Sequence, residues 1–117
     1  MTNQANNHNR GLYALMLMFL LMVFFMGCKK ESTPGPNEVW MQNNSFNPSS
    51  ITIAQGATVK WINKDNATHN VVSGSAFSSG DIVGGASYSR TFTSTGTFQY
   101  VCTYHMGMGG SVVVAMN

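Results

Sequence analysis

Residues 38–116 contain short runs in which apolar and polar side chains alternate, and this pattern most limits what the chain can fold into. Alternation with a period of two is typical of strands that bury one face. No run in this region keeps helical spacing over three turns. The clearest strand is predicted over 58–63, where Val59, Trp61 and Asn63 share one face. The pattern therefore predicts an all-β domain.

Turn-forming residues separate the predicted strands. Residues 43–50 are predicted to form a turn, and residues 73–85, rich in serine and glycine without a period, are predicted to form a loop. About seven strands in about eighty residues favour a small antiparallel Greek-key β-sandwich. Further strands are predicted over 38–42, 51–53, 86–93, 97–102 and 111–116. Residues 69–72 are predicted to form a buried segment.

The N-terminal part of the chain has a different character. Residues 11–27 carry no charge, and their apolar run of about fifteen residues fits a secretory signal better than the ~20 residues of a membrane-spanning helix. Cys28 follows Gly27, an arrangement that resembles the bacterial lipoprotein cleavage box, in which lipid is attached to the cysteine. Phe25 and Met26 depart from the residues usual in that box. The alternative is an uncleaved membrane anchor in which Cys28 has no role. Both interpretations export the rest of the chain.

Three segments follow from this interpretation. Residues 1–27 are predicted to be a signal peptide, and residues 28–36, polar with two prolines, a lipidated flexible tether. Residues 37–117 are predicted to be the folded domain, held by lipid to a bacterial membrane and lying in the periplasm or at the cell surface. A domain of this size has a marginal core, so a bound metal or a cross-link would help to stabilise it.

The charge balance excludes one class of partner. After the signal, five lysines and arginines face four carboxylates, and no basic cluster or basic–aromatic stripe is present. Nucleic-acid binding is therefore not expected.

The cysteines favour a metal. The chain has only two cysteines, and if Cys28 carries lipid, then Cys102 has no partner for a disulfide. A lone thiol in an oxidising compartment is a liability unless it is buried or bound.

The stretch VCTYHMGMGG, residues 101–110, brings several metal-ligand types together. Cys102 ends a predicted strand, His105 lies three residues later and Met108 three further. His69 follows another predicted strand about thirty residues earlier, so both turns can meet at one end of a sandwich. Each residue alone has an ordinary interpretation as a buried side chain. Together, two histidines, a thiolate and a weak thioether are the ligand set of a blue-copper electron-transfer site. A structural zinc site would more often show paired cysteine or histidine spacing and no methionine.

With this ligand pattern, the chain resembles the cupredoxins of the plastocyanin and amicyanin group. The short spacing between His105 and Met108 is similar to amicyanin. The resemblance covers nearly the whole domain and rests on these motifs: Phe46-x-Pro48, Ile51-x-Ile53, Gly56, Val59-x-Trp61, Asn63-x-Asp65, Thr68-His-Asn-Val71, Cys102-x-x-His105-x-x-Met108 and Met108-Gly-Gly-Ser-Val-Val-Val114.

The resemblance implies a site and a function. One mononuclear type 1 copper ion would be held by His69, Cys102, His105 and Met108. Asn70 would join the two ligand loops, with its backbone N–H aimed at the thiolate. The expected function is one-electron transfer by a monomeric, membrane-anchored carrier outside the cytoplasm, which exchanges electrons with redox proteins and is not an enzyme. The sequence has no His-x-His pairs of the kind that suggest a multicopper oxidase.

Several alternatives stay open. Tyr104 stands where the family commonly has proline, which removes a rigid backbone angle from the ligand loop. In an alignment with a longer loop, Gly110 takes the axial position and Met108 only packs beside the site; Met106 is a third candidate. Asn70 can also be an ordinary turn residue. Two other functions fit the same residues: a copper-binding or delivery module without a redox-shuttle role, and a metal-free β-sandwich used for adhesion.

Overall fold

The computed structural model describes Gly27 and residues 32–117. The predicted signal peptide, apart from Gly27, and Cys28 lie outside the described residues. Residues 33–117 form one compact unit. Among the residues that the structure describes, no helix is long and apolar enough to cross a membrane.

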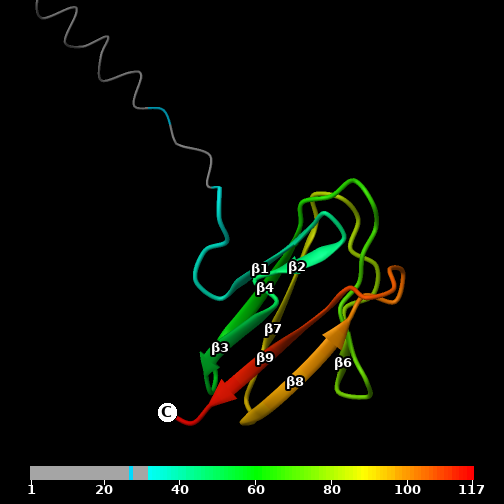
Figure 1. The fold of residues 1–117 in the computed structure, drawn as a ribbon. Coiled ribbons are helices and arrows are strands. Elements are labelled where there is room, and N and C mark those ends of the chain that lie inside the picture. The colour runs from blue at the N-terminus through cyan, green and yellow to red at the C-terminus, as the bar shows by residue number, and fades with distance from the viewer. Residues whose placement is uncertain (1–26, 28–31) are drawn as a thin grey trace, which may run out of the picture. The chain divides into compact units, whose positions relative to one another are not determined.

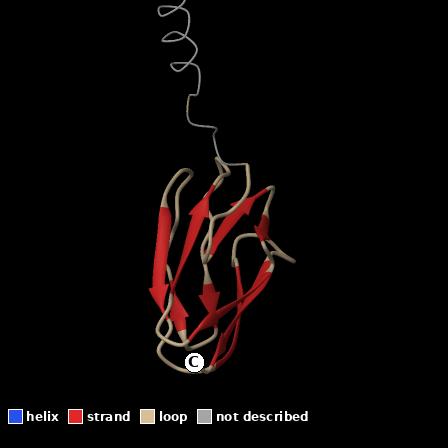
Figure 2. Ribbon diagram, turned by 90° about the vertical axis from the view of Figure 1, so that its left-hand side faces the viewer, coloured by secondary structure: helices blue, strands red, loops and turns tan. Residues whose placement is uncertain are grey.

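Nine strands in the described part of the chain form two sheets that pack face to face (Figures 1 and 2). The four-stranded sheet has the order β2 (Ser45–Asn47), β1 (Glu38–Gln42), β4 (Thr58–Asn63) and β7 (Ser87–Thr91). The five-stranded sheet has the order β3 (Ser50–Ala54), β9 (Gly109–Ala115), β8 (Gly96–Val101), β5 (Val72–Ser73) and β6 (Phe77–Ser78).

The structure confirms an all-β sandwich, although its pairing is mixed. Most neighbouring strands are antiparallel, but β1 pairs with β4 and β3 pairs with β9 in parallel. The chain reaches β4 from β1 through β3, which lies in the other sheet, so the two strands run in the same direction. A purely antiparallel sandwich was therefore too simple a prediction.

Two strands lie in segments that were predicted to be a turn and a loop. The strand β2 forms a hairpin with β1 because Asn43 and Asn44 adopt positive φ angles of 55° and 53°, which asparagine tolerates and which favour tight hairpins. The strand β6 pairs with β5 over two residues. Strands this short are set by backbone pairing with a neighbour, which alternation in the sequence does not reveal.

The core lies between the sheets and is centred on Trp61, which is fully buried. Its ring contacts Tyr100 edge-on at a centroid distance of 5.4 Å, and it also packs against Phe77, Tyr88 and Phe92. Each fully buried large side chain of this kind contributes about 1.5–3 kcal/mol through removal from water. The same packing directs β8, because Tyr100 and Cys102 face the core while Val101 between them is exposed.

Candidate metal centre

Three potential ligand atoms converge at one end of the sandwich. The Nδ1 atoms of His69 and His105 lie 3.2 Å apart, and Cys102 Sγ lies 3.8 Å from the first and 3.7 Å from the second. His69 is fully buried, Cys102 is buried and His105 is partly exposed. Two loops more than thirty positions apart in sequence thus present two ring nitrogens and a sulfur to one point.

The spacing of these atoms fits a metal ion. A point in their plane that is equally distant from all three lies about 2.1 Å from each, within the ~2.0–2.3 Å typical of bonds from a transition metal to imidazole nitrogen and thiolate sulfur. An ion at that point would have a trigonal set of two nitrogens and one sulfur, the arrangement found in blue-copper sites.

The ligand loop between β8 and β9 is short and closed by its own backbone. The N–H of Cys102 donates to the carbonyl of Met108 at 2.9 Å, and the N–H of Met108 donates to the carbonyl of His105 at 3.2 Å. Gly107 closes the turn with a φ of 82°, a conformation that favours glycine. The two hydrogen bonds hold Cys102, His105 and Met108 on one side of a compact loop.

Both the backbone and the ring of His69 are held by hydrogen bonds. Its backbone pairs with Ile82 through two hydrogen bonds of 3.1 and 2.8 Å. Its ring Nε2 lies 2.8 Å from Asp65 Oδ2. Because an ionised carboxylate only accepts, Nε2 carries the proton and Nδ1 keeps its lone pair toward the centre. The Asp65–His69 contact therefore selects the tautomer that a metal needs.

Asp65 is itself held by the hairpin turn between β1 and β2. The backbone N–H of Asn43 donates to Asp65 Oδ1 at 2.8 Å, and that of Asn44 donates to Oδ2 at 3.1 Å. Partial burial acts to raise the pKa of Asp65, but the hydrogen bonds from Asn44, His69 and Asn43 leave this pKa below its ordinary value. The carboxyl group is thus kept ionised.

Asn70 and Thr103 connect the two ligand loops. The side-chain amide of Asn70 donates to Thr103 Oγ1 at 2.7 Å, and the backbone N–H of Thr103 donates to Asn70 Oδ1 at 2.8 Å. These residues directly follow His69 and Cys102, so the pair of bonds sets the distance between the two ligands. The expected hydrogen bond from the Asn70 backbone N–H to the sulfur stays a prediction.

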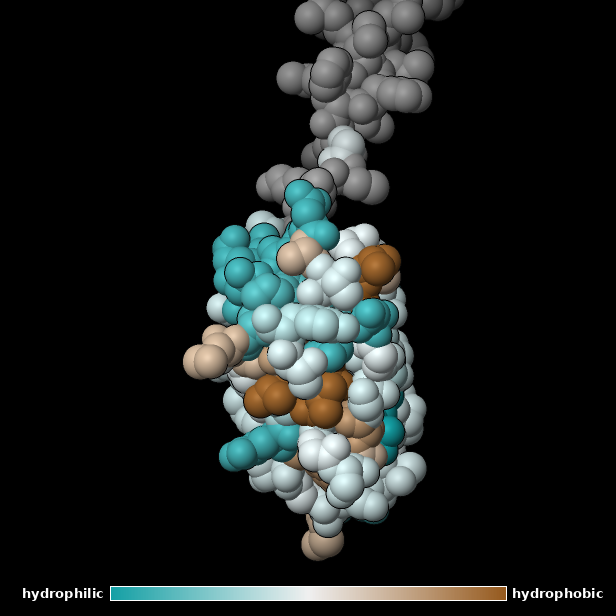
Figure 3. Space-filling view, turned by 90° about the vertical axis from the view of Figure 1, so that its right-hand side faces the viewer, coloured by the Kyte–Doolittle hydropathy of each residue, from teal (hydrophilic) through white to brown (hydrophobic). Residues whose placement is uncertain are grey.

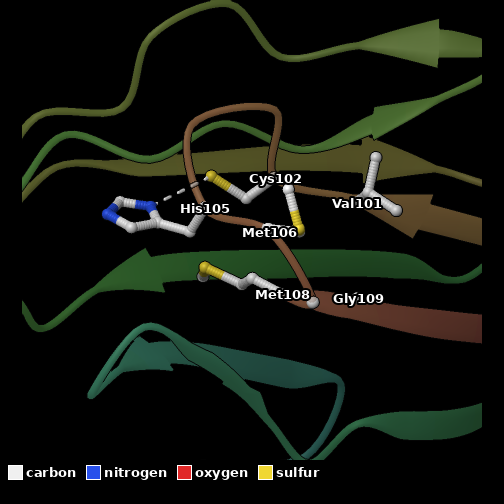
Figure 4. A pocket seen from close by; sticks show the side chains of 7 residues that line it. Val101, Cys102, His105, Met106, Met108 and Gly109 are labelled. Carbon is white, nitrogen blue, oxygen red and sulfur yellow. Dashed lines mark hydrogen bonds between the residues drawn. The ribbon is translucent and has the colours of Figure 1, made fainter.

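Met108 and Met106 occupy different environments. Met108 is buried, and its sulfur points to the same side as Cys102 Sγ and the ring of His105 (Figure 4). Met106 is fully exposed. A pocket of about 440 Å³ opens beside them, lined by Val101, Cys102 and residues 105–109. Gly110, the alternative axial position, lies against the phenol of Tyr100 instead.

Two residues important to this arrangement received no role from the sequence. Asp65 appeared only as part of a family motif, and its position four residues before His69 is the signal that could have assigned it. Asn63 is fully buried at the end of β4, and its side-chain amide donates to the carbonyls of Ala67 and Ile82 at 2.8 Å each. A polar residue on the apolar face of a strand could have indicated this role.

Known proteins resemble this chain in sequence and in fold. A model of the cupredoxin-like domain family matches residues 14–114. The chain is 37% identical to plastocyanin from Scenedesmus fuscus over 59% of its length and 85% of the relative's. It is 39% identical to amicyanin from Paracoccus denitrificans, covering 72% of this chain and 69% of that one.

Solved structures of copper proteins also resemble this chain in fold. A reduced Cu(I) form of an amicyanin mutant superposes with a TM-score of 0.63 and 30% identity, over 74% of this chain and 86% of that one. A copper-containing nitrite reductase from Thermus scotoductus SA-01 superposes with a TM-score of 0.64 and 30% identity over 77% of this chain, but this chain spans only 24% of the reductase.

Proposed function

The chain belongs to the cupredoxin-like family, and on this premise we propose that residues 37–117 are a one-electron carrier that holds one mononuclear type 1 copper ion. The proposed ligands are His69, Cys102 and His105, with Met108 as the weak axial ligand. The observation that carries the proposal is the convergence of two ring nitrogens and one sulfur at bonding distance from a common point. Copper would supply a cycle between the cuprous and cupric states.

The protein's own residues hold the site in one geometry. Asp65 orients the ring of His69, and the Asn70–Thr103 pair ties the two loops together. A site fixed in this way rearranges little when its charge changes, which favours fast electron transfer. The buried sulfur of Cys102 is screened from solvent, which protects the thiolate from oxidation.

His105 offers the route to a partner. It is partly exposed on the ligand loop, whereas His69 is fully buried. Around it, Met106 is fully exposed and Val101 is half exposed, and the face that carries β6 and β8 has a small apolar area surrounded mainly by residues of intermediate hydropathy (Figure 3). A small, weakly charged contact area suits the brief encounters of redox proteins. We therefore propose redox proteins as donors and acceptors, and a monomeric carrier instead of an enzyme.

We further propose that the carrier is exported and anchored by lipid on Cys28 to a bacterial membrane, with the domain in the periplasm or at the cell surface. The apolar residues 11–27 and the polar tether 28–36 support this proposal. Intact-mass measurement of the membrane fraction tests it, because a cleaved and lipidated chain begins at Cys28 and carries the mass of its acyl groups.

Reconstitution with cupric copper tests the main proposal. A carrier gives an intense thiolate-to-copper band in the visible range that bleaches with ascorbate and returns on oxidation. A weakly coloured protein that passes copper to a chelator would instead indicate a delivery module, for which the exposed thioether of Met106 is the supporting observation. Absence of copper binding would leave only the metal-free sandwich.

A further inference from the structure

The side chain of Tyr104 connects the ligand loop between β8 and β9 to the segment between β6 and β7. Its hydroxyl donates to Asp81 Oδ1, although its side chain is about half exposed. The hydrogen bond to the Asp81 carboxylate is also the main reason why the pKa of Tyr104 lies above its ordinary value. Asp81 belongs to the segment between β6 and β7, so the bond spans 23 residues of sequence.

Both ends of this hydrogen bond lie next to a ligand or its support. Tyr104 directly precedes His105. Asp81 directly precedes Ile82, which pairs with the backbone of His69 through two hydrogen bonds. A restraint on the Tyr104 side chain therefore holds the backbone directly before His105 in place relative to the segment that supports His69.

The backbone around Tyr104 has few other restraints. Thr103 and Tyr104 form a turn, and within the described residues the N–H groups of Tyr104 and Met106 donate no hydrogen bond to another protein group. The loop is held at Thr103 on one side and at Met108 on the other. Between these points, the hydrogen bond from Tyr104 to Asp81 attaches the residue directly before His105 to the segment between β6 and β7.

We propose that Tyr104 is a positioning residue for His105, and that its hydrogen bond to Asp81 replaces the backbone restriction that a proline imposes at this position. Proline restrains a loop locally by fixing one φ angle. Tyrosine leaves that angle free and restrains the loop by a contact with a distant segment instead. The part of this inference that concerns copper rests on the proposed function, whereas the part that concerns the loop does not.

The copper-free full chain tests the loop directly. Tyr104→Phe and Asp81→Asn should each speed amide hydrogen exchange at Thr103 and Met108, the hydrogen-bonded amides on either side of Tyr104 and His105, by about three- to tenfold, the effect of losing one partly exposed hydrogen bond to a charged group. The double variant should be no faster than either single one, because both remove the same contact. Tyr88→Phe is the matched control: it loses the same hydroxyl on β7, away from both loops, and should leave this exchange unchanged.

Tyr104→Pro provides a rescue. Tyr104 has no positive φ and its N–H donates no hydrogen bond within the described chain, so proline at this position would remove no hydrogen bond. This variant should restore slow exchange at Thr103 and Met108, and adding Asp81→Asn should then have no effect. A rescue of this kind would not occur if Tyr104 were merely part of the surface.

The copper-loaded chain gives a second measurement. Tyr104→Phe and Asp81→Asn should shift the intensity ratio of the visible thiolate-to-copper bands in the same direction and speed copper loss to a chelator several-fold, while Tyr104→Pro restores both. Additive effects in the double variant, or an effect of only one single variant, would overturn the inference. If the wild type binds no copper but the exchange results hold, the proposed function fails and the loop restraint stands.

Discussion

Asp65 Oδ2 lies 2.8 Å from Nε2 of His69, so the most deeply buried candidate ligand is oriented by a carboxylate that is itself anchored in a hairpin turn. The turn at Asn43 and Asn44 lies 22 and 21 residues away in sequence from the carboxylate that it binds. The proposed copper site therefore depends on three separate segments of the chain, and only two of them carry ligands.

Asp65→Asn should weaken copper binding by about 10–100-fold, the usual effect of removing the hydrogen-bond partner of a ligating histidine. The amide keeps the shape of the carboxylate but no longer makes His69 Nδ1 a strong donor. Loss of a nearby negative charge should also raise the reduction potential, because the cupric state carries more positive charge. Competition with a copper chelator and a redox titration measure the two effects.

Glu38→Gln is the charge-matched control for this experiment. It also removes one carboxylate, but from the start of β1, where Glu38 accepts from the backbone of Gly35. Equal losses of affinity in the two variants would mean that overall charge, and not the contact with His69, controls binding.

The same contact predicts how stability depends on pH in the copper-free protein. The pKa of folded Asp65 lies below its ordinary value of 3.8, so the folded chain binds fewer protons there than the unfolded chain does. The stabilisation is fully present above pH 3.8 and is lost as the pH falls through the folded pKa. Urea unfolding of the wild type and of Asp65→Asn at about pH 5 and about pH 3 should show a larger acid loss in the wild type. Parallel losses would contradict the role given to Asp65.

Cys102→Ser should abolish the visible band while leaving the fold intact. The hydroxyl has almost the volume of the thiol and fits the buried position, but it cannot supply the soft anionic donor that the intense transition requires. The absorption spectrum after copper addition measures the first effect, and circular dichroism of the copper-free protein checks the second. A visible band that persists in this variant would show that its origin lies elsewhere.

The assignment of Met108 as axial ligand stays a prediction that substitution can test. Met108→Gln should retain copper and lower the reduction potential, because an amide oxygen is a harder donor that favours the cupric state. Met106→Gln is the matched control, since Met106 is fully exposed and should leave the potential and spectrum unchanged. A reversal of these two results would transfer the axial role to Met106.

Much of this fold was predictable because its longer strands alternate clearly. The predicted strands over 38–42 and 58–63 coincide with β1 and β4. The segment 69–72 was predicted to be buried, and His69 makes an isolated bridge there before β5 begins at Val72. Alternation of apolar and polar residues indicates which side chains are buried, and the residues of these segments were predicted correctly because burial determines their pattern.

The supporting contacts of the site could not be predicted in the same way. The close spacing of Cys102, His105 and Met108 in the sequence predicted that they share one loop, because a short loop limits how far apart they can lie. The bonds from Asn43 to Asp65 and from Tyr104 to Asp81 join positions about twenty residues apart. Such contacts depend on how the loops at one end of the sandwich meet, which no local pattern encodes.

Gly110→Ala should destabilise the domain, because the new methyl carbon would lie 2.6 Å from Tyr100 Oη and 2.8 Å from the carbonyl oxygen of Ser49. Tyr100 is buried in the core against Trp61 and cannot move without disturbing it, so we expect a loss of about 1–3 kcal/mol, as for other overpacked sites. Gly109→Ala is the matched control one position earlier on β9, where the nearest atom would be 3.4 Å away. Denaturant unfolding of both variants in the copper-free state measures the difference. Similar losses in the two variants would show that the β9 backbone, and not the phenol of Tyr100, requires glycine here.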